Sequence, residues 1–301
     1  MTRARRALEA LALVLLAACQ DARPSTPEPA PHDDAGATSP SDARVNDASA
    51  GDAIPRGTDA LADAGAPEEP ASLACLAHTY AGAPARAEDG RWGLRLDGGV
   101  FVPWTKRDDE RTDTDPFDLA DIWEQAYPTG PIKPITEVDF DPGRVRVDPL
   151  FLATYGRTAA EVMKHLVTVV VGGKGFPVHE KVAPALRRVA ARVSAAMAKD
   201  PSLARFFAAP GGTFNWRFIA GTKELSMHSW GIAIDLDTGL SHYWRNEPAP
   251  PKWKNKYPQA IVDAFEAEGF IWGGRWYHFD TMHFEYRPEL AAASCAPHRK
   301  T

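Results

Sequence analysis

Two short stretches of the chain hold the side chains best able to bind a metal ion and to move a proton. The first, SMHSWGIAID, contains His228 and Asp235, seven residues apart. The second, WYHFDTMHFEY, places Asp280 three residues before His283. Catalytic zinc sites typically use three protein ligands, His or carboxylate, and keep a fourth position open. We therefore take His228, Asp235 and His283 as candidate ligands of Zn²⁺.

The first stretch can supply two ligands only if the chain bends between them. In a straight strand, His228 and Asp235 would lie about 23 Å apart, from the usual rise per residue. Gly231 is the residue best able to make a sharp bend, because it lacks a Cβ atom. Taken alone, the stretch fits equally well a structural histidine at a turn, and it is the second stretch that favours a metal site.

A carboxylate near a metal site that is not itself a ligand can take a proton from the attacking water. Asp280 is the candidate for this general base. Glu285 is the alternative, because it shares a strand face with His283. The other interpretation of Glu285 is that it orients a ligand histidine. His278 could likewise orient a ligand or donate a hydrogen bond to the transition state.

Together the two stretches resemble a known family. The pattern Ser-x-His-x-x-Gly-x-Ala-x-Asp, followed far downstream by Asp-x-x-His, is similar to the zinc peptidases that cut peptidoglycan stem peptides. These include the D-alanyl-D-alanine carboxypeptidases and dipeptidases of vancomycin resistance and the L-alanyl-D-glutamate endopeptidases of phage lysins, which share a fold with lysostaphin-type enzymes and the hedgehog domain. The resemblance covers about residues 139–290 and does not extend to residues 76–138.

The resemblance implies roles for individual residues. It implies that the three candidate ligands bind zinc and that Asp280 is the general base. It implies that Arg217, in NWRFIAGT, contacts the substrate carbonyl or carboxylate, and that Ser226 lies on the substrate side. The aspartate at the base position favours carboxypeptidases and endopeptidases over dipeptidases. We expect a D-alanyl-D-alanine carboxypeptidase, with an L-alanyl-D-glutamate endopeptidase or a non-catalytic wall-binding lipoprotein as alternatives.

The N-terminal residues resemble the signal peptide of a bacterial lipoprotein. Residues 1–18 combine three arginines with a short apolar run that ends in Leu-Ala-Ala before Cys19. The resemblance implies cleavage before Cys19 and a lipid on this residue, so that the protein is exported and anchored to a membrane. Gln20 favours the periplasmic face of the outer membrane in a diderm bacterium. The alternative is a plain signal peptide in which Cys19 has no role.

Residues 19–72 are predicted to be a disordered tether, because they contain no aromatic residue and few aliphatic ones. Residues 20–72 contain eleven acidic residues and three arginines, a net charge of −8. The whole chain carries −6 and residues 1–18 carry +2, so residues 73–301 are neutral. A neutral domain gives no indication of nucleic-acid binding, and the sequence implies no protein partner.

Residues 73–301 are predicted to form one zinc peptidase domain of the α+β class, with a small antiparallel sheet that carries the site and helices that flank it. Its two cysteines, Cys75 and Cys295, lie near its ends, and export would allow them to form a disulfide; two free thiols are the alternative. Periodicity and turn residues predict helices over residues 117–126, 158–166, 180–199, 203–208 and 258–269, a buried strand over 167–171, and further strands over 216–220, 232–236 and 282–286.

Overall fold

The computed structural model describes residues 69–105, 117–219, 222–291 and 295. All of them belong to the second of two compact units, Asp63–Thr301. The predicted signal peptide, Cys19 and the tether up to residue 68 lie outside the described residues. Helix α1 (Ala71–Tyr80) is the first element among the described residues, so the last two residues assigned to the tether, 71 and 72, are helical. In the described part of the chain, no helix is long and apolar enough to cross a membrane.

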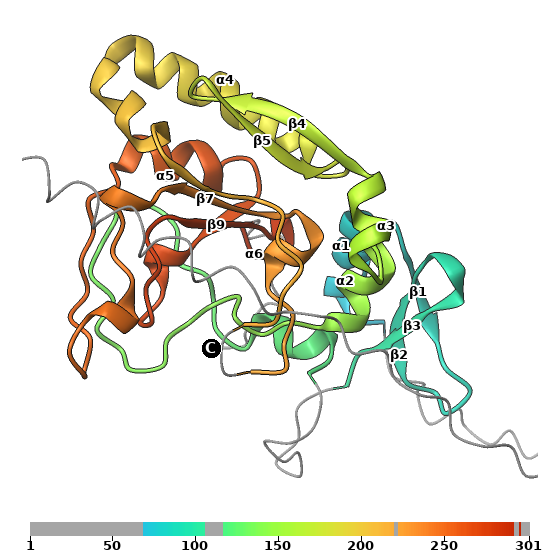
Figure 1. The fold of residues 1–301 in the computed structure, drawn as a ribbon. Helices are drawn as coiled ribbons and strands as arrows, with labels where there is room; N and C mark the ends of the chain where they lie inside the picture. The colour runs from blue at the N-terminus through green and yellow to red at the C-terminus, as the bar shows by residue number, and fades with distance from the viewer. Residues whose placement is uncertain (1–68, 106–116, 220–221, 292–294, 296–301) are drawn as a thin grey trace, which may run out of the picture. The chain divides into compact units, whose positions relative to one another are not determined.

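The sheet that carries the candidate site has four strands in the order β6-β7-β9-β8, all antiparallel to their neighbours. They are β6 (Pro210–Gly212), β7 (Ala233–Asp237), β8 (Phe270–Trp272) and β9 (His283–Tyr286). Helices α4 (Ala183–Lys199) and α5 (Gln259–Glu266) pack against each other, and α5 also contacts β8. The α+β class and the small antiparallel sheet are confirmed (Figure 1).

Successive side chains of β7 point alternately to the hydrophobic core and to the candidate site, as the sequence of this strand predicts. Ile234 and Leu236 are fully buried in the hydrophobic core, whereas Asp235 is turned to the other face and keeps some exposure. Asp235 pairs in register with His283 on β9. The strand pairing alone therefore brings together two of the candidate ligands.

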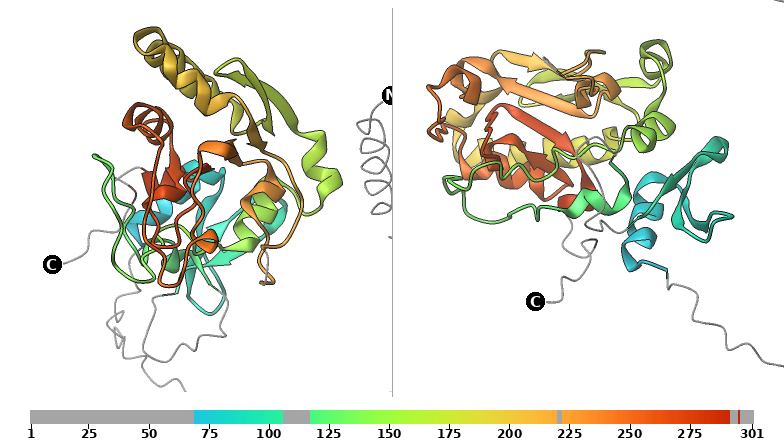
Figure 2. Two further views of the ribbon diagram at one scale, coloured as in Figure 1. Left: turned by 60° about the vertical axis from the view of Figure 1, so that its left-hand side comes forward. Right: turned by 90° about the horizontal axis from the view of Figure 1, so that it is seen from below.

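A second sheet is a hairpin of β4 (Leu166–Val171) and β5 (Lys174–His179). Figures 1 and 2 show this hairpin beside α4, which contacts β4. The predicted strand at 167–171 is present as part of β4, but the prediction that it is buried holds for one face only, and Val170 is 61% exposed. Two short helices precede it, α2 (Asp148–Tyr155) and α3 (Ala159–Lys164).

The N-terminal region, for which the sequence predicted little, forms a third sheet in the order β1-β2-β3. Its strands are β1 (Ala83–Arg86), β2 (Trp92–Arg95) and β3 (Phe101–Pro103), and α1 packs against the first two. The structure contains the predicted disulfide: Cys75, in α1, is bonded to Cys295, which follows the last helix, α6 (Pro288–Ala291). It links positions 220 residues apart.

Three predicted elements differ in the structure. Of the strand predicted over 216–220, the described residues 216–219 do not form a strand, because the backbone of Arg217 bonds to the motif turn instead: its N–H donates to Ser229 Oγ, and its carbonyl accepts from Ser226 N–H. The predicted helices at 117–126 and 203–208 are 3-10 helices. The structure has η1 (Asp97–Gly99), η2 (Leu119–Trp123), η3 (Pro201–Phe207), η4 (Met227–Trp230), η5 (Thr238–Leu240), η6 (Trp244–Asn246) and η7 (Gly273–Arg275).

Candidate metal centre

The first motif folds as a 3-10 turn followed by a bend into β7. Ser226 caps the turn η4, and its Oγ accepts a hydrogen bond from the backbone N–H of His228 at 3.4 Å. Gly231 ends the turn with φ of +64°, in the left-handed region that glycine adopts without strain. The predicted bend is confirmed, and it lets His228 reach back to Asp235 on the strand.

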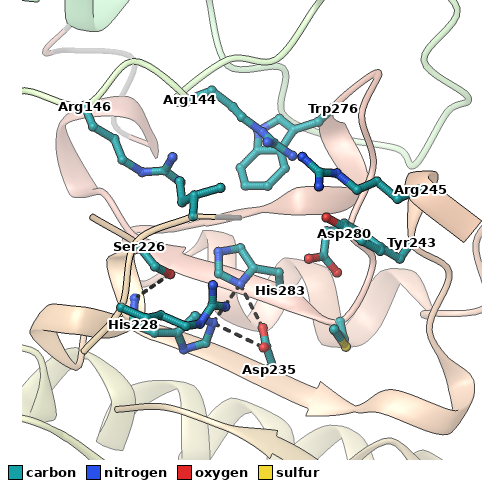
Figure 3. A pocket seen from close by; sticks show the side chains of 13 residues that line it. Arg144, Arg146, Ser226, His228, Asp235, Tyr243, Arg245, Trp276, Asp280 and His283 are labelled. Atoms are coloured by element: carbon teal, nitrogen blue, oxygen red, sulfur yellow. Dashed lines mark hydrogen bonds and ion pairs between the residues drawn. The ribbon is translucent and has the colours of Figure 1, made fainter. Parts of the chain in front are cut away.

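His228, Asp235 and His283 form a tight cluster (Figure 3). One ligand atom from each residue lies within 4.8 Å of the other two. The carboxylate of Asp235 is 2.8 Å from His283 Nδ1 and 3.2 Å from His228 Nε2, and the two ring nitrogens are 3.3 Å apart. Two imidazole nitrogens and a carboxylate oxygen could therefore bind one metal ion.

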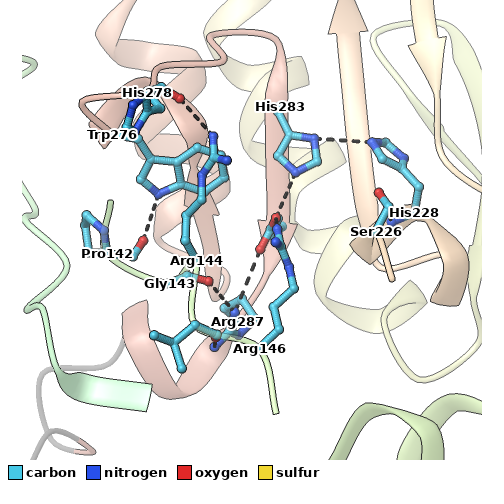
Figure 4. Close-up of polar contacts among 12 residues, drawn as sticks. Pro142, Gly143, Arg144, Arg146, Ser226, His228, Trp276, His278, His283 and Arg287 are labelled. Atoms are coloured by element: carbon cyan, nitrogen blue, oxygen red, sulfur yellow. Dashed lines mark hydrogen bonds and ion pairs between the residues drawn. The ribbon is translucent and has the colours of Figure 1, made fainter. Parts of the chain in front are cut away.

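The far nitrogen of each histidine is held by a second contact. Nδ1 of His228 lies 2.7 Å from the carbonyl oxygen of Thr213. Nε2 of His283 lies 2.9 Å from Glu285 Oε1, which also accepts a hydrogen bond from Arg146 at 2.7 Å (Figure 4). Such contacts fix the ring orientation of a ligand histidine. Glu285 is fully buried and bonded in this way, so its position fits the orienting role and not that of the general base.

The charges of the cluster suit a cation. Burial lowers the pKa of His283, but its hydrogen bonds to Asp235 and Glu285 outweigh burial and raise that pKa to about 10. Burial raises the pKa of Asp235, but hydrogen bonds from His228 and His283 hold it well below its usual range. The metal-free site thus keeps ionised carboxylates around a protonated histidine, and a divalent cation could replace this proton.

Asp280 lies beside the cluster without belonging to it. Burial raises the pKa of its carboxyl to about 6. Its Oδ1 is buried and has no hydrogen-bond partner among the described residues. The carboxyl faces the same cavity as the three candidate ligands. A buried acceptor without a partner is rare in proteins, and here it is placed to receive a proton from a molecule in the cavity.

The cavity has a volume of about 250 Å³ and brings together all the residues predicted to bind metal, to bind substrate or to act in catalysis. Ser226 and Arg217 lie in its wall with the ligands and Asp280. Trp276 also lines this wall. Sequence reasoning missed the three arginines and the tyrosine that complete it: Arg144, Arg146, Arg245 and Tyr243. The two arginines in DPGRVRVDPLF were the only signal for this part of the wall, and it concerns only Arg144 and Arg146.

His278 lies behind the wall of the cavity. Its Nδ1 is 2.6 Å from Asp141 Oδ2, and its carbonyl oxygen accepts a hydrogen bond from Arg144 at 2.9 Å. It is not among the residues that line the cavity. His278 therefore supports Arg144, and it is not placed to donate to a transition state.

A comparison with protein families agrees with this geometry. Residues 220–286 match the sequence model of a family described as D-alanyl-D-alanine carboxypeptidase. The matched segment contains Ser226, the three candidate ligands and Asp280, whereas Arg217 lies before it. No solved structure matches the chain. The chain thus carries a segment of a metallopeptidase family, with a His-Asp-His cluster that could bind the metal.

Proposed function

We propose that the protein is a zinc-dependent D-alanyl-D-alanine carboxypeptidase that acts on the stem peptides of peptidoglycan. One observation carries the proposal. The His-Asp-His cluster and the unpartnered carboxyl of Asp280 face a single cavity, and they lie in the segment that matches the carboxypeptidase family.

Zinc is the metal that fits the donor set best. Two imidazole nitrogens and one carboxylate oxygen are typical of catalytic zinc sites. When bound, zinc would polarise the scissile carbonyl and lower the pKa of the attacking water toward about 7. The carbonyl of Thr213 and the carboxylate of Glu285 keep the two imidazoles turned toward the ion.

Asp280 acts as the base and then as the acid of the hydrolysis. It takes a proton from the attacking water as the water oxygen bonds to the scissile carbonyl carbon. It then gives this proton to the amine nitrogen as the carbon–nitrogen bond breaks, so that a free amine and a carboxylic acid form, and the acid loses its remaining proton to the solvent. Burial, which raises the pKa of Asp280 to about 6, brings this group nearer to the operating pH, where proton transfer is most efficient.

Arg217 and Ser226 contact the substrate from the same cavity. The guanidinium of Arg217 stabilises the negative charge that develops on the carbonyl oxygen. Ser226 orients His228 through its bond to the backbone N–H of that residue, and its side chain lies against the bound peptide.

An L-alanyl-D-glutamate endopeptidase is the second candidate. A further cavity of about 330 Å³ shares Arg144, Arg146, Arg245 and Ile219 with the first and would lengthen the groove. A non-catalytic wall-binding protein is disfavoured, because such a protein has no use for an unpartnered carboxyl beside a metal site.

We also propose that the chain is a lipoprotein anchored through Cys19 and carried to the wall by its tether. Peptidoglycan is a polymer that cannot diffuse to the membrane, so the enzyme must reach it. Because helix α1 begins at Ala71, the proposed tether is residues 20–70, and a flexible chain of this length would have a mean reach of about 40 Å and a maximum of about 175 Å. Fractionation of cells that express Cys19→Ser should move the protein from the membrane to the soluble fraction; unchanged membrane association would contradict the anchor.

The activity is tested with defined stem peptides that end in D-Ala-D-Ala. The zinc-loaded protein should release the terminal D-alanine, and the products are identified by mass spectrometry. Protein stripped of metal by a chelator is the control and should release none. Cleavage between L-alanine and D-glutamate would replace the carboxypeptidase by the endopeptidase, and no cleavage by protein that retains zinc would contradict both.

A further inference from the structure

We propose that Arg144 and Arg245 form a clamp for the C-terminal carboxylate of the substrate, and that this clamp restricts the enzyme to removal of a terminal residue. The inference rests on the proposed peptidase function. It assigns a specificity role to two residues that lie on different segments of the chain and meet at the wall of the cavity.

Arg144 is a cation held in place without an anionic partner. Its Cζ lies 4.5 Å from the centroid of the Trp276 ring, and its Nη2 donates to the carbonyl oxygen of His278 at 2.9 Å. Its Nε is buried without a hydrogen-bond partner, and no carboxylate among the described residues forms an ion pair with it. Arg144 is half-buried, and a charge partly removed from water is unfavourable unless it is paired, so this guanidinium is suited to bind a ligand anion.

Arg146, the nearest other arginine in sequence, is different. Its Nη2 is paired with the buried Glu285 at 2.7 Å, and this carboxylate also contacts the ligand His283. The charge of Arg146 is thus balanced within the support of the metal site. Of the two arginines in this segment, Arg144 is the one left to meet a substrate anion.

Arg245 approaches the same place from another segment. Its Cζ lies 5.2 Å from the centroid of the Trp244 ring, and that ring is 4.4 Å from the ring of His278. His278 therefore supports both arginines, one through its carbonyl and one through Trp244. Figure 3 shows the side chains of Arg144 and Arg245 converging in front of Trp276, on the side of the cavity where Asp280 lies. Two guanidinium groups can bind one carboxylate with several charge-assisted hydrogen bonds.

The position of Asp280 identifies which carboxylate this is. Asp280 must give its proton to the leaving amine, so the departing residue lies next to Asp280. In a C-terminal residue, a single carbon separates the amine nitrogen from the carboxylate. The carboxylate therefore lies close to Asp280 as well. Arg144 and Asp280 line the same cavity, so the guanidinium of Arg144 faces the space that the departing residue would occupy.

The clamp also lies at the end of the first cavity, where the second cavity begins. Arg144, Arg146 and Arg245 line both cavities and so stand at the boundary between them. A terminal carboxylate bound at this boundary ends the peptide there. A chain that continued into the second cavity would place a neutral amide against Arg144 and leave this cation without an anion.

The test compares two peptides that differ only in the terminal charge: one ends in D-Ala-D-Ala with a free carboxylate, the other in the corresponding amide. The ratio of kcat/KM for the acid to kcat/KM for the amide measures the clamp. We expect wild-type protein to prefer the acid by about a hundredfold, and Arg144→Gln and Arg245→Gln each to reduce this ratio about tenfold or more, because each removes charge-assisted hydrogen bonds.

The matched control is Arg205→Gln, since Arg205 is also an arginine stacked on an aromatic ring, Phe206, but is exposed and away from the cavity. It should keep the wild-type ratio. The ratio is compared only in variants that retain the wild-type kcat/KM for the amide, because a loss of structure would lower kcat/KM for both peptides. A wild-type ratio near one, or ratios in the Arg144→Gln and Arg245→Gln variants equal to that of wild type, would overturn the clamp.

A second measurement separates this inference from the proposed function. If zinc-loaded wild-type protein cleaves neither peptide, the peptidase proposal fails, and the clamp is tested by calorimetric titration with D-alanine and with D-alaninamide. The clamp predicts that D-alanine binds at least tenfold more tightly than the amide and that Arg144→Gln abolishes the difference. Equal binding of the two compounds by wild-type protein would overturn it.

Discussion

At the scale of single residues, the contact between Glu285 and His283 should control metal affinity. Glu285→Gln keeps the shape of the side chain but removes the charge that holds Nε2 of His283 and balances Arg146. Loss of such a supporting carboxylate typically weakens metal binding about 10- to 100-fold. Competition with a fluorescent zinc chelator measures the affinity.

The control for this change is Glu180→Gln. Glu180 also contacts a histidine nitrogen, His165 Nδ1, at 3.0 Å, but this pair is exposed and lies outside the cavity. Its variant should bind zinc like wild type. If Glu285→Gln also bound zinc with wild-type affinity, the proposal that Glu285 orients His283 would be wrong.

The proton on His283 makes zinc binding depend on pH. Because the pKa of His283 is raised to about 10 in the metal-free protein, this residue is protonated at pH 8, and zinc must displace the proton from Nδ1. Zinc affinity should therefore rise with pH until about pH 10. Calorimetry at pH 8 in two buffers of different ionisation enthalpy should show release of about one proton; release near zero would mean that His283 is already neutral.

The sequence predicted the candidate ligands but not the arginines around them. The ligands could be predicted because a turn, a glycine and one strand pairing bring His228, Asp235 and His283 together. Arg144 reaches the cavity through packing between distant segments, by stacking on Trp276. Nothing in the spacing of residues around Arg144 indicates that contact.

At the scale of elements, the bend at Gly231 positions His228. A Cβ atom at Gly231 would lie 2.8 Å from Leu166 Cδ2 and 3.2 Å from the backbone nitrogen of His179, in addition to the cost of a positive φ. Gly231→Ala should lower the free energy of unfolding by about 2 kcal/mol or more and weaken zinc binding. Chemical denaturation measures the first effect.

Gly173→Ala is the matched control. Gly173 has a φ of +82° but no atom within 4 Å of an added Cβ, so this variant carries only the backbone cost, about 1–2 kcal/mol. It should leave zinc affinity unchanged. Equal destabilisation by both variants, with zinc affinity retained in both, would show that the close approach at Gly231 does not matter.

Helices and strands whose apolar residues show a clear helical or alternating period were predicted well. Elements without such a period were predicted wrongly or missed. Helix α4 and strands β7 and β9 lie where their apolar residues predicted them. The predicted strand at 216–220 failed because the backbone of Arg217 found partners in the motif turn, and tertiary contacts of this kind override local propensity. Strand β8 was missed because its three residues, all buried, are too few to show a period.

At the scale of the whole molecule, the disulfide should stabilise the fold strongly. Cys75–Cys295 closes a loop of about the full length of the domain, with a separation of 220 residues. The chain-entropy estimate for so long a loop is about 5 kcal/mol. The double variant Cys75→Ser, Cys295→Ser should lose most of this free energy of unfolding. Oxidised and reduced wild-type protein provide the matched pair, and equal unfolding midpoints would contradict the prediction.

Residues 76–138, which the family resemblance does not cover, include side chains that support the sheet carrying the site. Tyr127 Oη accepts a hydrogen bond from the N–H of Trp272 at 2.7 Å, and Trp123 Nε1 donates to the carbonyl oxygen of Glu289 at 3.1 Å. These contacts join residues more than a hundred positions apart in sequence. These contacts could not be predicted from the sequence, because this segment shows no strong periodicity of apolar residues.

The central claim is that Asp280 moves protons at a zinc site without binding the zinc. The most direct test measures D-alanine release and zinc content together in wild type, Asp280→Asn and His283→Ala. We expect Asp280→Asn to keep one zinc and to lose activity by about a hundredfold or more, as is typical for a lost general base, and His283→Ala to lose both. Near-normal D-alanine release by Asp280→Asn, or release by protein free of zinc, would contradict the account.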